Sequence, residues 1–493
     1  MLSFIGRLGR GRYGLLAFLL PLGVYLIGLN GKWSSDYPTS ILGMQYAMWA
    51  KHSLSLGTSG TLIVSSADLS SFAGNFYSAI SPGLAILSFP FAALGFVLDG
   101  NTLNLWGWSL ILDEAFVAVC SAAAVTVVYE TARLYASEKA SLAAALALAF
   151  ATPLWPASTV LYIHGVSLMF STLSIYFVFR FTHGKGGSTS LLAAGIFLGL
   201  AGFVEYVALL FVVPVALYLA VRRFPKAIPK FLTGFSIGPA AQLIYNYVAF
   251  QNPLLFPEAL KTGASGSLLS RFDPYSALTH VAFYLMSPYR GIFLFSPIAV
   301  LGLFALLRLE GRRIPRWDAV LLGSIFVITL VTYSSWTDWD GGLFYGPRFL
   351  ILGLPGLMIP LAVAVDEWPT KSMGVTMFLL FIVSSFVEGV GALSTAFGVQ
   401  GGPLTFQLAD LNLPWLLQGN LDAWWISMWS LQTSGFVALL PICAFAILWA
   451  AGMIVVLRLR VSFHLDWPKT LGPNLPAIGK TKTTAAVKTE TKT

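Results

Sequence analysis

Residues 318–335 read DAVLLGSIFVITLVTYSS, and residues 336–349, which follow directly, read WTDWDGGLFYGPRF. The first stretch is apolar over about 18 residues, which is long enough for a helix to cross the hydrocarbon core of a bilayer. Residues 308–316, just before it, include four arginines, and the positive-inside rule places them in the cytoplasm. The aromatic and glycine-rich stretch at 336–349 is therefore predicted to lie on the outer face.

Apolar segments of this kind recur along a chain that is 57% hydrophobic and only 10% charged. A soluble domain is usually about 25% charged, so this chain cannot cover its surface with polar groups and must face lipid. The segments lie near 13–30, 79–98, 106–130, 140–155, 157–180, 188–204, 205–222, 232–250, 291–308, 318–335, 349–366, 373–395 and 434–457. We predict an all-α, polytopic transmembrane bundle of about 12 spans, and about 10 to 14 are compatible with the segment lengths.

The net charge of +8 comes from the two ends of the chain. Residues 1–12 carry three arginines and no acid, and residues 458–493 carry seven basic and two acidic residues. Both ends are therefore predicted to be cytoplasmic, in a multi-pass protein of the cell membrane. We predict a transmembrane domain over 1–457 and a basic, disordered tail over 458–493. No basic and aromatic groove indicates nucleic-acid binding.

The first predicted outer loop holds a carboxylate directly after a span. Asp36 lies between Trp33 and Tyr37 at the expected membrane boundary, where partial loss of solvent suits a general base. The alternative is a solvated loop acid or a helix N-cap. Residues 41–54 are too short and too polar to span, and they predict a helix lying along the interface. The loop ends as NFYSAISPG over 75–83.

Further motifs follow in order along the chain: ATPLWP at 151–156, His164, GLAGFVEY at 199–206, QNP at 251–253, SPYRG at 287–291 and WTDWDGGLFYGPRF at 336–349. Together with the first outer loop, this series resembles the GT-C class of membrane glycosyltransferases. It is most similar to the GT39-like, dolichyl-phosphate-mannosyltransferase-like members of that class. The resemblance covers most of residues 13–366. It implies a GT-C-like fold, a polyprenyl-phosphate-linked sugar donor, and a glycan, lipid or protein as acceptor.

The arginines of the last two motifs predict where the donor binds. Arg290 and Arg348 lie on the predicted outer face against the positive-inside bias, and a guanidinium there can pair bidentately with a lipid phosphate. Tyr289, Trp339 and Tyr345 suit the membrane boundary and can stack on a sugar ring. The alternative is that the arginines only extend toward the headgroups and the rings form an ordinary aromatic belt.

Five more residues are candidates for the site: Glu205, His164, Tyr77, Asp338 and Asp340. An acid inside an apolar segment is costly, which makes Glu205 a candidate functional group. Alternatively, Glu205 marks a turn between two helices or pairs with His164. Tyr77 belongs to the motif that precedes the second predicted span. Asp338 and Asp340 can hold a divalent cation beside a phosphate, so a divalent cation stays open as a cofactor. No two histidines have metal-ligand spacing, so we predict no zinc site.

These expectations combine into one predicted reaction. Asp36 removes a proton from an acceptor hydroxyl on the extracytoplasmic face, and a hexose or pentose is transferred from the lipid phosphate. A single displacement inverts the anomeric centre. A multi-span transporter or lipid flippase is the first alternative, although it predicts inverted repeats that the sequence does not show. A noncatalytic assembly subunit is the second.

Overall fold

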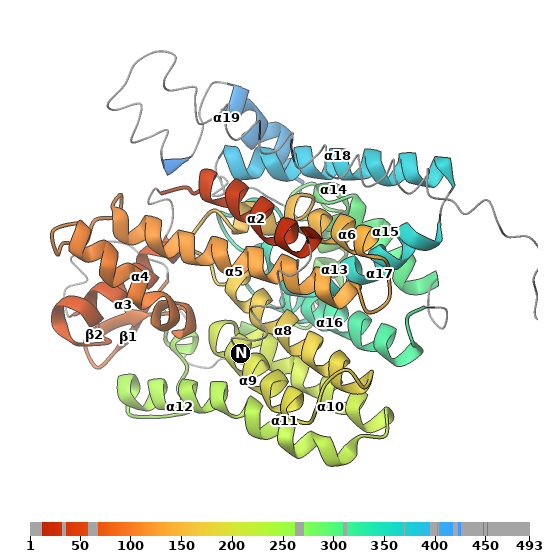
Figure 1. The fold of residues 1–493 in the computed structure, drawn as a ribbon. Coiled ribbons are helices and arrows are strands. Elements are labelled where there is room, and N and C mark those ends of the chain that lie inside the picture. The colour runs from red at the N-terminus through yellow and green to blue at the C-terminus, as the bar shows by residue number, and fades with distance from the viewer. Residues whose placement is uncertain are drawn as a thin grey trace, which may run out of the picture.

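The computed structural model describes residues 12–417 except 32–35, 58–67, 262–270, 309–312, 369, 395–401 and 403, together with Ala423, Trp424, Ile447 and Ala451. Apart from the last two of these residues, the predicted span at 434–457 and the predicted tail at 458–493 lie outside the described part. That part is a bundle of helices with one two-stranded hairpin at one end (Figure 1).

The first half of the chain contains both strands. Its elements are α2 (Arg12–Ile27), α3 (Asp36–Lys51), β1 (Leu69–Phe72), β2 (Asn75–Ser78), α4 (Gly83–Leu98), α5 (Trp108–Ala132), α6 (Glu138–Phe150), α7 (Leu154–Ala157), α8 (His164–Thr182), α9 (Thr189–Val204), η1 (Tyr206–Phe211), α10 (Val212–Val221), η2 (Pro225–Ala227), α11 (Ile228–Phe235) and α12 (Ile237–Phe250).

The described part of the second half is helical. Its elements are η3 (Pro257–Leu260), α13 (Ala277–Met286), α14 (Ile292–Phe295), α15 (Ile298–Arg308), α16 (Arg316–Ser334), η5 (Arg348–Gly353), α17 (Pro355–Glu367), α18 (Lys371–Leu393), η6 (Gln407–Asn412) and α19 (Leu413–Leu417).

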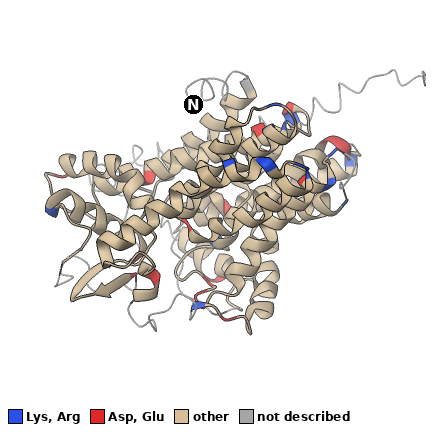
Figure 2. Cartoon of the chain, turned by 90° about the horizontal axis from the view of Figure 1, so that it is seen from below, with Lys and Arg blue, Asp and Glu red and all other residues tan. Residues whose placement is uncertain are grey.

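Four of the described helices are long and apolar enough to cross a membrane: α5, α8, α16 and α18. Other predicted spans are built from two shorter elements, because proline and polar residues interrupt the helix. Residues 291–308, for example, form α14 and α15, which are separated at Pro297. Most of the ribbon carries no charged residue (Figure 2). The helical membrane class is confirmed, and the number of spans stays a prediction.

Hydrogen bonds join loops that are distant in sequence. The backbone N–H of Ser137 and the Nη1 of Arg313 donate to Asp366 at 2.7 and 3.0 Å. The backbone N–H of Thr337 donates to the carbonyl of Arg271 at 2.8 Å. The side of the membrane on which each loop lies stays a prediction.

Glycines let α9 pack closely against α11 and α12. A Cβ added to Gly238 of α12 would lie 1.8 Å from the carbonyl oxygen of Gly199, and one added to Gly234 would lie 2.3 Å from that of Leu192. Small residues spaced four apart are a common means of close helix contact in membranes. This packing fixes the position at which α9 ends, beside the candidate site.

The first outer loop differs from its prediction in two ways. The predicted interfacial helix is present as α3, but it begins at Asp36, and most of its residues between 38 and 47 are buried against α4 and β2. Strands β1 and β2 were not predicted; they pair antiparallel, with Leu69 opposite Ser78. The hairpin turn is Ala73-Gly74, with φ of 49° and 76°, which is the sign that tight hairpin turns require.

Two acids near the start of α5, Asp113 and Glu114, are buried. They are 0% and 1% exposed. The carboxylate of Glu114 accepts a hydrogen bond at 2.7 Å from the backbone N–H of Gly31, which follows the first span. The acid therefore satisfies a buried backbone donor rather than facing the headgroups.

Candidate active site

The site lies where the sequence motifs of four distant segments meet. The glycine of the 75–83 motif explains one of these meetings, since a Cβ on Gly83 would lie 2.3 Å from the carbonyl oxygen of Phe203. The hydroxyl of Ser81 donates to the carbonyl of Val204, the last residue of α9. Close backbone contact thus joins the start of α4 to the end of α9, beside Glu205.

Arg348 occupies the centre of this region in a cage of aromatic rings. Its guanidinium carbon lies 4.4 Å from the ring centroid of Tyr162, 4.7 Å from that of Phe349, 5.4 Å from that of Tyr37 and 5.5 Å from that of Phe344. The residue is 8% exposed. Its Nε and Nη1 are buried and have no hydrogen-bond partner among the residues that the structure describes. Ring faces stabilise the positive charge but leave these N–H groups without an acceptor.

The loop before Arg348 owes its shape to Arg290. The Nε of Arg290 donates to the carbonyl of Asp340, and its Nη2 donates to that of Gly342 at 2.7 Å. Its Nη1 donates to its neighbour Tyr289 at 3.1 Å and to Gln407 at 2.6 Å. Burial lowers the pKa of Arg290 to about 10, which leaves it charged at neutral pH. Because its donors are engaged with protein oxygens, Arg290 fits a loop-shaping role better than the predicted phosphate contact.

Glycine is required at the point where this loop passes Arg348. Gly341 has a φ of +69°, and a Cβ there would lie 2.9 Å from the Nε of Arg348. Gly342 also has a positive φ, +65°, but a Cβ there would meet nothing within 4 Å. The first glycine therefore makes room for the guanidinium, whereas the second serves only the turn.

Gln407, which the sequence did not single out, holds the same loop in place from the start of η6. Its Oε1 accepts hydrogen bonds from the Nη1 of Arg290 at 2.6 Å and from the backbone N–H of Gly346 at 3.0 Å. Its Nε2 donates to the carbonyl of Phe344 at 3.0 Å. The side chain is fully buried. An isolated glutamine in a loop carries no sequence signal for such a role.

Asp36 lies in the same neighbourhood as Arg348. It is the first residue of α3 and is half-buried. The next residue, Tyr37, stacks on Tyr162 with ring centroids 4.4 Å apart and contributes a wall of the Arg348 cage. The backbone of the predicted carboxylate thus adjoins a residue whose ring contacts the Arg348 guanidinium, although Asp36 and Arg348 are 312 positions apart in sequence.

Glu205 and His164 form a buried pair beside the cage. The Nδ1 of His164 is 3.2 Å from both carboxylate oxygens of Glu205, and the hydroxyl of Tyr333 donates to the same carboxylate. Both members of the pair are almost fully buried. Glu205 has an extended backbone and separates α9 from η1. It therefore both marks the break between two helices and pairs with His164, which were the two structural alternatives for this residue. Tyr162 and Tyr333 are site residues that the sequence reading missed, because an apolar segment hides them.

The remaining predicted rings contact protein. Tyr345 is fully buried and donates its hydroxyl to the carbonyl of Val387 at 2.8 Å, and the ring of Tyr289 lies 3.7 Å from the guanidinium carbon of Arg290. Trp339 stacks on His280 at 4.7 Å. The ring of Tyr77 packs on Phe250 at 5.0 Å. These contacts give no support to direct sugar stacking by Tyr345, since its ring is enclosed.

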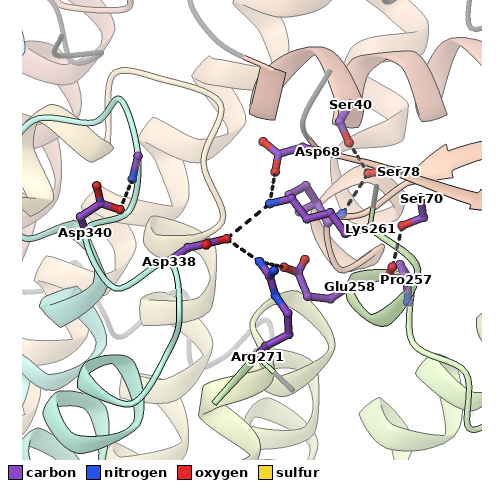
Figure 3. A network of polar contacts seen from close by, with 12 residues as sticks. Ser40, Asp68, Ser70, Ser78, Pro257, Glu258, Lys261, Arg271, Asp338 and Asp340 are labelled. Carbon is purple, nitrogen blue, oxygen red and sulfur yellow. Dashed lines mark hydrogen bonds and ion pairs between the residues drawn. The ribbon is translucent and has the colours of Figure 1, made fainter. Parts of the chain in front are cut away.

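Asp338 belongs to a network of ion pairs that joins three outer loops (Figure 3). It pairs with Arg271, and with Lys261 at 3.7 Å; Lys261 also pairs with Asp68 at 3.0 Å, and Arg271 with Glu258 at 3.5 Å. Asp340 instead accepts the backbone N–H of Gly342 at 3.1 Å. Within the described part of the chain, no three histidine, cysteine or acidic side chains form a group able to hold a metal ion.

Comparisons with known proteins agree with the motifs. Residues 87–239, which contain Tyr162, His164 and Glu205, match the family model of dolichyl-phosphate-mannose-protein mannosyltransferases. No curated protein matches the chain in sequence.

Solved structures share the fold over most of the chain. ArnT from Cupriavidus metallidurans bound to undecaprenyl phosphate is 15% identical, with a TM-score of 0.53 over 91% of this chain and 77% of that one. Its apo form is 14% identical, with a TM-score of 0.52 over 92% and 74%. An Archaeoglobus fulgidus oligosaccharyltransferase tethered to an acceptor peptide is 11% identical, with a TM-score of 0.51 over 78% and 55%. The chain therefore has the fold of the GT-C membrane glycosyltransferases, as its motifs predicted.

Proposed function

We propose that this protein is a membrane glycosyltransferase that moves a sugar from a polyprenyl phosphate to an acceptor hydroxyl on the extracytoplasmic face. The observation that carries the proposal is Arg348, a buried cation whose Nε and Nη1 have no acceptor among the described residues. Leaving such donors unmatched is costly, so a ligand is expected to supply the acceptor. A phosphate fits, because a guanidinium binds its oxygens through two parallel hydrogen bonds.

Asp36 is the proposed general base for the acceptor hydroxyl. In the proposed reaction, the acceptor hydroxyl gives its proton to the Asp36 carboxylate and its oxygen attacks the anomeric carbon. The bond between that carbon and the phosphate oxygen breaks, and the lipid phosphate leaves with the electron pair. Arg348 stabilises the charge that develops on the phosphate. One displacement of this kind inverts the anomeric centre, and the sugar is a hexose or pentose.

The resemblance supports the choice of donor. One of the structures with this fold is a protein bound to undecaprenyl phosphate, and another is an oligosaccharyltransferase tethered to an acceptor peptide. The rings around Arg348 also give the site the mixed apolar and cationic character that a lipid phosphate requires.

The test is transfer by the purified protein from a panel of polyprenyl-phosphate sugars, with mass spectrometry of the products. We expect Asp36→Asn to lower turnover by at least about 100-fold, because an amide cannot take the proton. Asp273→Asn is the matched control, since Asp273 is another outer-loop acid whose carboxylate accepts the backbone N–H of Tyr275 at 3.0 Å. Near-normal turnover by Asp36→Asn would remove Asp36 as the base. Lipid movement without any covalent product would favour the flippase alternative.

A further inference from the structure

His164 presents a second buried nitrogen without a partner at the wall of the Arg348 cage. Its Nδ1 faces Glu205, and its Nε2 is buried with no hydrogen-bond partner among the described residues. The imidazole is 6.2 Å from the ring of Tyr162 and 5.8 Å from that of Phe349. These are the two rings nearest to the Arg348 guanidinium. Two unmatched nitrogens thus share the same aromatic walls.

The hydrogen bonds of Glu205 decide which form His164 takes before a ligand binds. A carboxylate that accepts from Tyr333 and lies 3.2 Å from Nδ1 holds the imidazole N–H at Nδ1. In the neutral ring, Nε2 then carries a lone pair, which repels an anion. Nε2 can donate to an anion only after the ring has taken up a proton.

The charges around His164 favour that uptake when an anion arrives. The groups facing the ring are Glu205 at the end of α9, Tyr333 from α16 and Tyr162 just before α8, with Arg348 from η5 against the same rings. From α5, the neutral hydroxyl of Ser121 faces the adjacent Gly165. Beside the ring, Glu205 and Arg348 carry opposite charges. A phosphodiester adds one negative charge, and one proton on His164 offsets that charge in a place where net charge is expensive.

We propose that His164 is a second ligand of the carrier phosphate and that binding of the phosphate loads one proton onto the His164–Glu205 pair. This inference rests on the proposed function, because it assumes that the Arg348 cage takes a polyprenyl phosphate. It adds that donor binding is coupled to proton uptake, and that the affinity for the donor therefore falls as the pH rises.

The experiment is isothermal titration of the full chain in lipid nanodiscs at pH 8. The probe is an undecaprenyl methyl phosphodiester, which has no group that titrates near neutrality. Running the titration in two buffers of different ionisation enthalpy gives the number of protons taken up. We expect the unmodified protein to take up as much as one proton for each diester that binds. We also expect the affinity for the diester to fall by up to about tenfold for each unit by which the pH is raised.

Two histidine variants separate this role from a structural one. His164→Gln should abolish proton uptake and flatten the pH dependence of binding. His183→Gln is the matched control, because His183 follows the other end of α8 and pairs with a carboxylate too, Asp318, at 2.6 Å. It should behave like the unmodified protein. If His164→Gln failed to fold, the number of protons taken up by the unmodified protein would still show whether phosphate binding is coupled to proton uptake.

Buffer-independent heats for the unmodified protein, or equal uptake by His164→Gln, would overturn the inference while leaving the proposed function intact. A protein that neither binds the diester nor transfers any sugar would overturn the proposed function itself. Inorganic phosphate and phosphatidylglycerol are titrated in parallel, and neither should produce the uptake. The same uptake with phosphatidylglycerol would mean that the site takes an ordinary lipid headgroup, which would contradict the assignment to a prenyl carrier.

Discussion

At the scale of single residues, the site depends on how Arg348 is held. The guanidinium is surrounded by four aromatic rings and lies close to Gly341, which has no side chain. Its Nε and Nη1 have no hydrogen-bond acceptor among the described residues. Such a residue is costly to bury without an acceptor, and an anionic ligand would satisfy its two N–H groups.

Arg348→Lys should weaken binding of undecaprenyl phosphate by about 10- to 100-fold, since an ammonium stacks poorly on rings and cannot form two parallel hydrogen bonds to one phosphate. Arg313→Lys, a half-exposed arginine on the predicted cytoplasmic side, is the control and should bind normally. The measurement is titration of the lipid into purified protein in nanodiscs. Equal affinities for both variants would show that Arg348 does not contact the phosphate.

The two glycines before Arg348 offer a matched pair. Gly341→Ala and Gly342→Ala both place a Cβ at positive φ, which costs about 1–2 kcal/mol each, but only the first drives an atom into the guanidinium. We expect similar losses of thermal stability in the two variants and a loss of lipid-phosphate binding in Gly341→Ala alone. Thermal unfolding and titration are measured on the same samples. Loss of binding in Gly342→Ala as well would indicate that the turn, and not the contact, matters.

Sequence reasoning selected Arg348 and Asp36 because each is a charge at the end of an apolar segment. It could not separate Arg348 from Arg290, since both stand beside proline and glycine on the same predicted face. The difference lies in their partners. Arg290 donates to oxygens of residues 50, 52 and 117 positions away, and no local pattern reveals such contacts.

At the scale of elements, the loop between α16 and η5 is shaped by two side chains from elsewhere, Arg290 and Gln407. Gln407→Ala removes two hydrogen bonds to this loop and one to Arg290. We expect the affinity for the lipid donor to drop by about tenfold or more, because the loop no longer holds Arg348 in place, while the acceptor affinity changes little. The measurement is the Michaelis constant for each substrate.

The control for this prediction is Asn412→Ala in the same short helix. Asn412 donates to the hydroxyl of Ser394 at 2.9 Å, a contact away from the Arg348 loop. If Asn412→Ala raised the donor KM as much as Gln407→Ala did, the effect would belong to the fold of the last loop as a whole.

Elements were predictable where the apolar pattern is long. Residues 373–395 and 318–335 were expected as spans, and α18 and α16 lie there. The sequence could not predict the exact helix bounds within 205–222 and 291–308. A proline indicates that a helix is interrupted, but it does not determine the backbone conformation that joins the two pieces. The hairpin at 69–78 was not predicted, because its strands of four residues each are too short to show a clear alternating pattern.

At the scale of the whole molecule, ion pairs tie the outer loops together across the chain. Burial alone would lower the pKa of Lys261, but the carboxylates of Asp68 and Glu258 outweigh it and raise the pKa. A raised folded-state pKa means that the stabilisation is fully present below the unfolded value of about 10.5 and is lost as the pH rises through the folded value. The tie between the loops should therefore persist at neutral pH and weaken in strong alkali.

A double-mutant cycle of Lys261→Met and Asp68→Asn measures this tie. The two side chains are 17% and 18% exposed, so we expect a coupling of about 1 kcal/mol in the free energy of unfolding. Thermal unfolding at low and high salt provides the readout, and the coupling should shrink at high salt. A coupling of zero at low salt would show that the pair contributes nothing to holding the loops.

The position of Gln407 has a consequence for biosynthesis. Asp36, His164, Glu205 and Arg348 all leave the ribosome before the residue that secures the Arg348 loop. A nascent chain that has been synthesised as far as Arg348 thus contains these chemical groups but lacks the hydrogen bonds from Gln407. The protein should reach its full affinity for the lipid donor only when synthesis has passed Gln407.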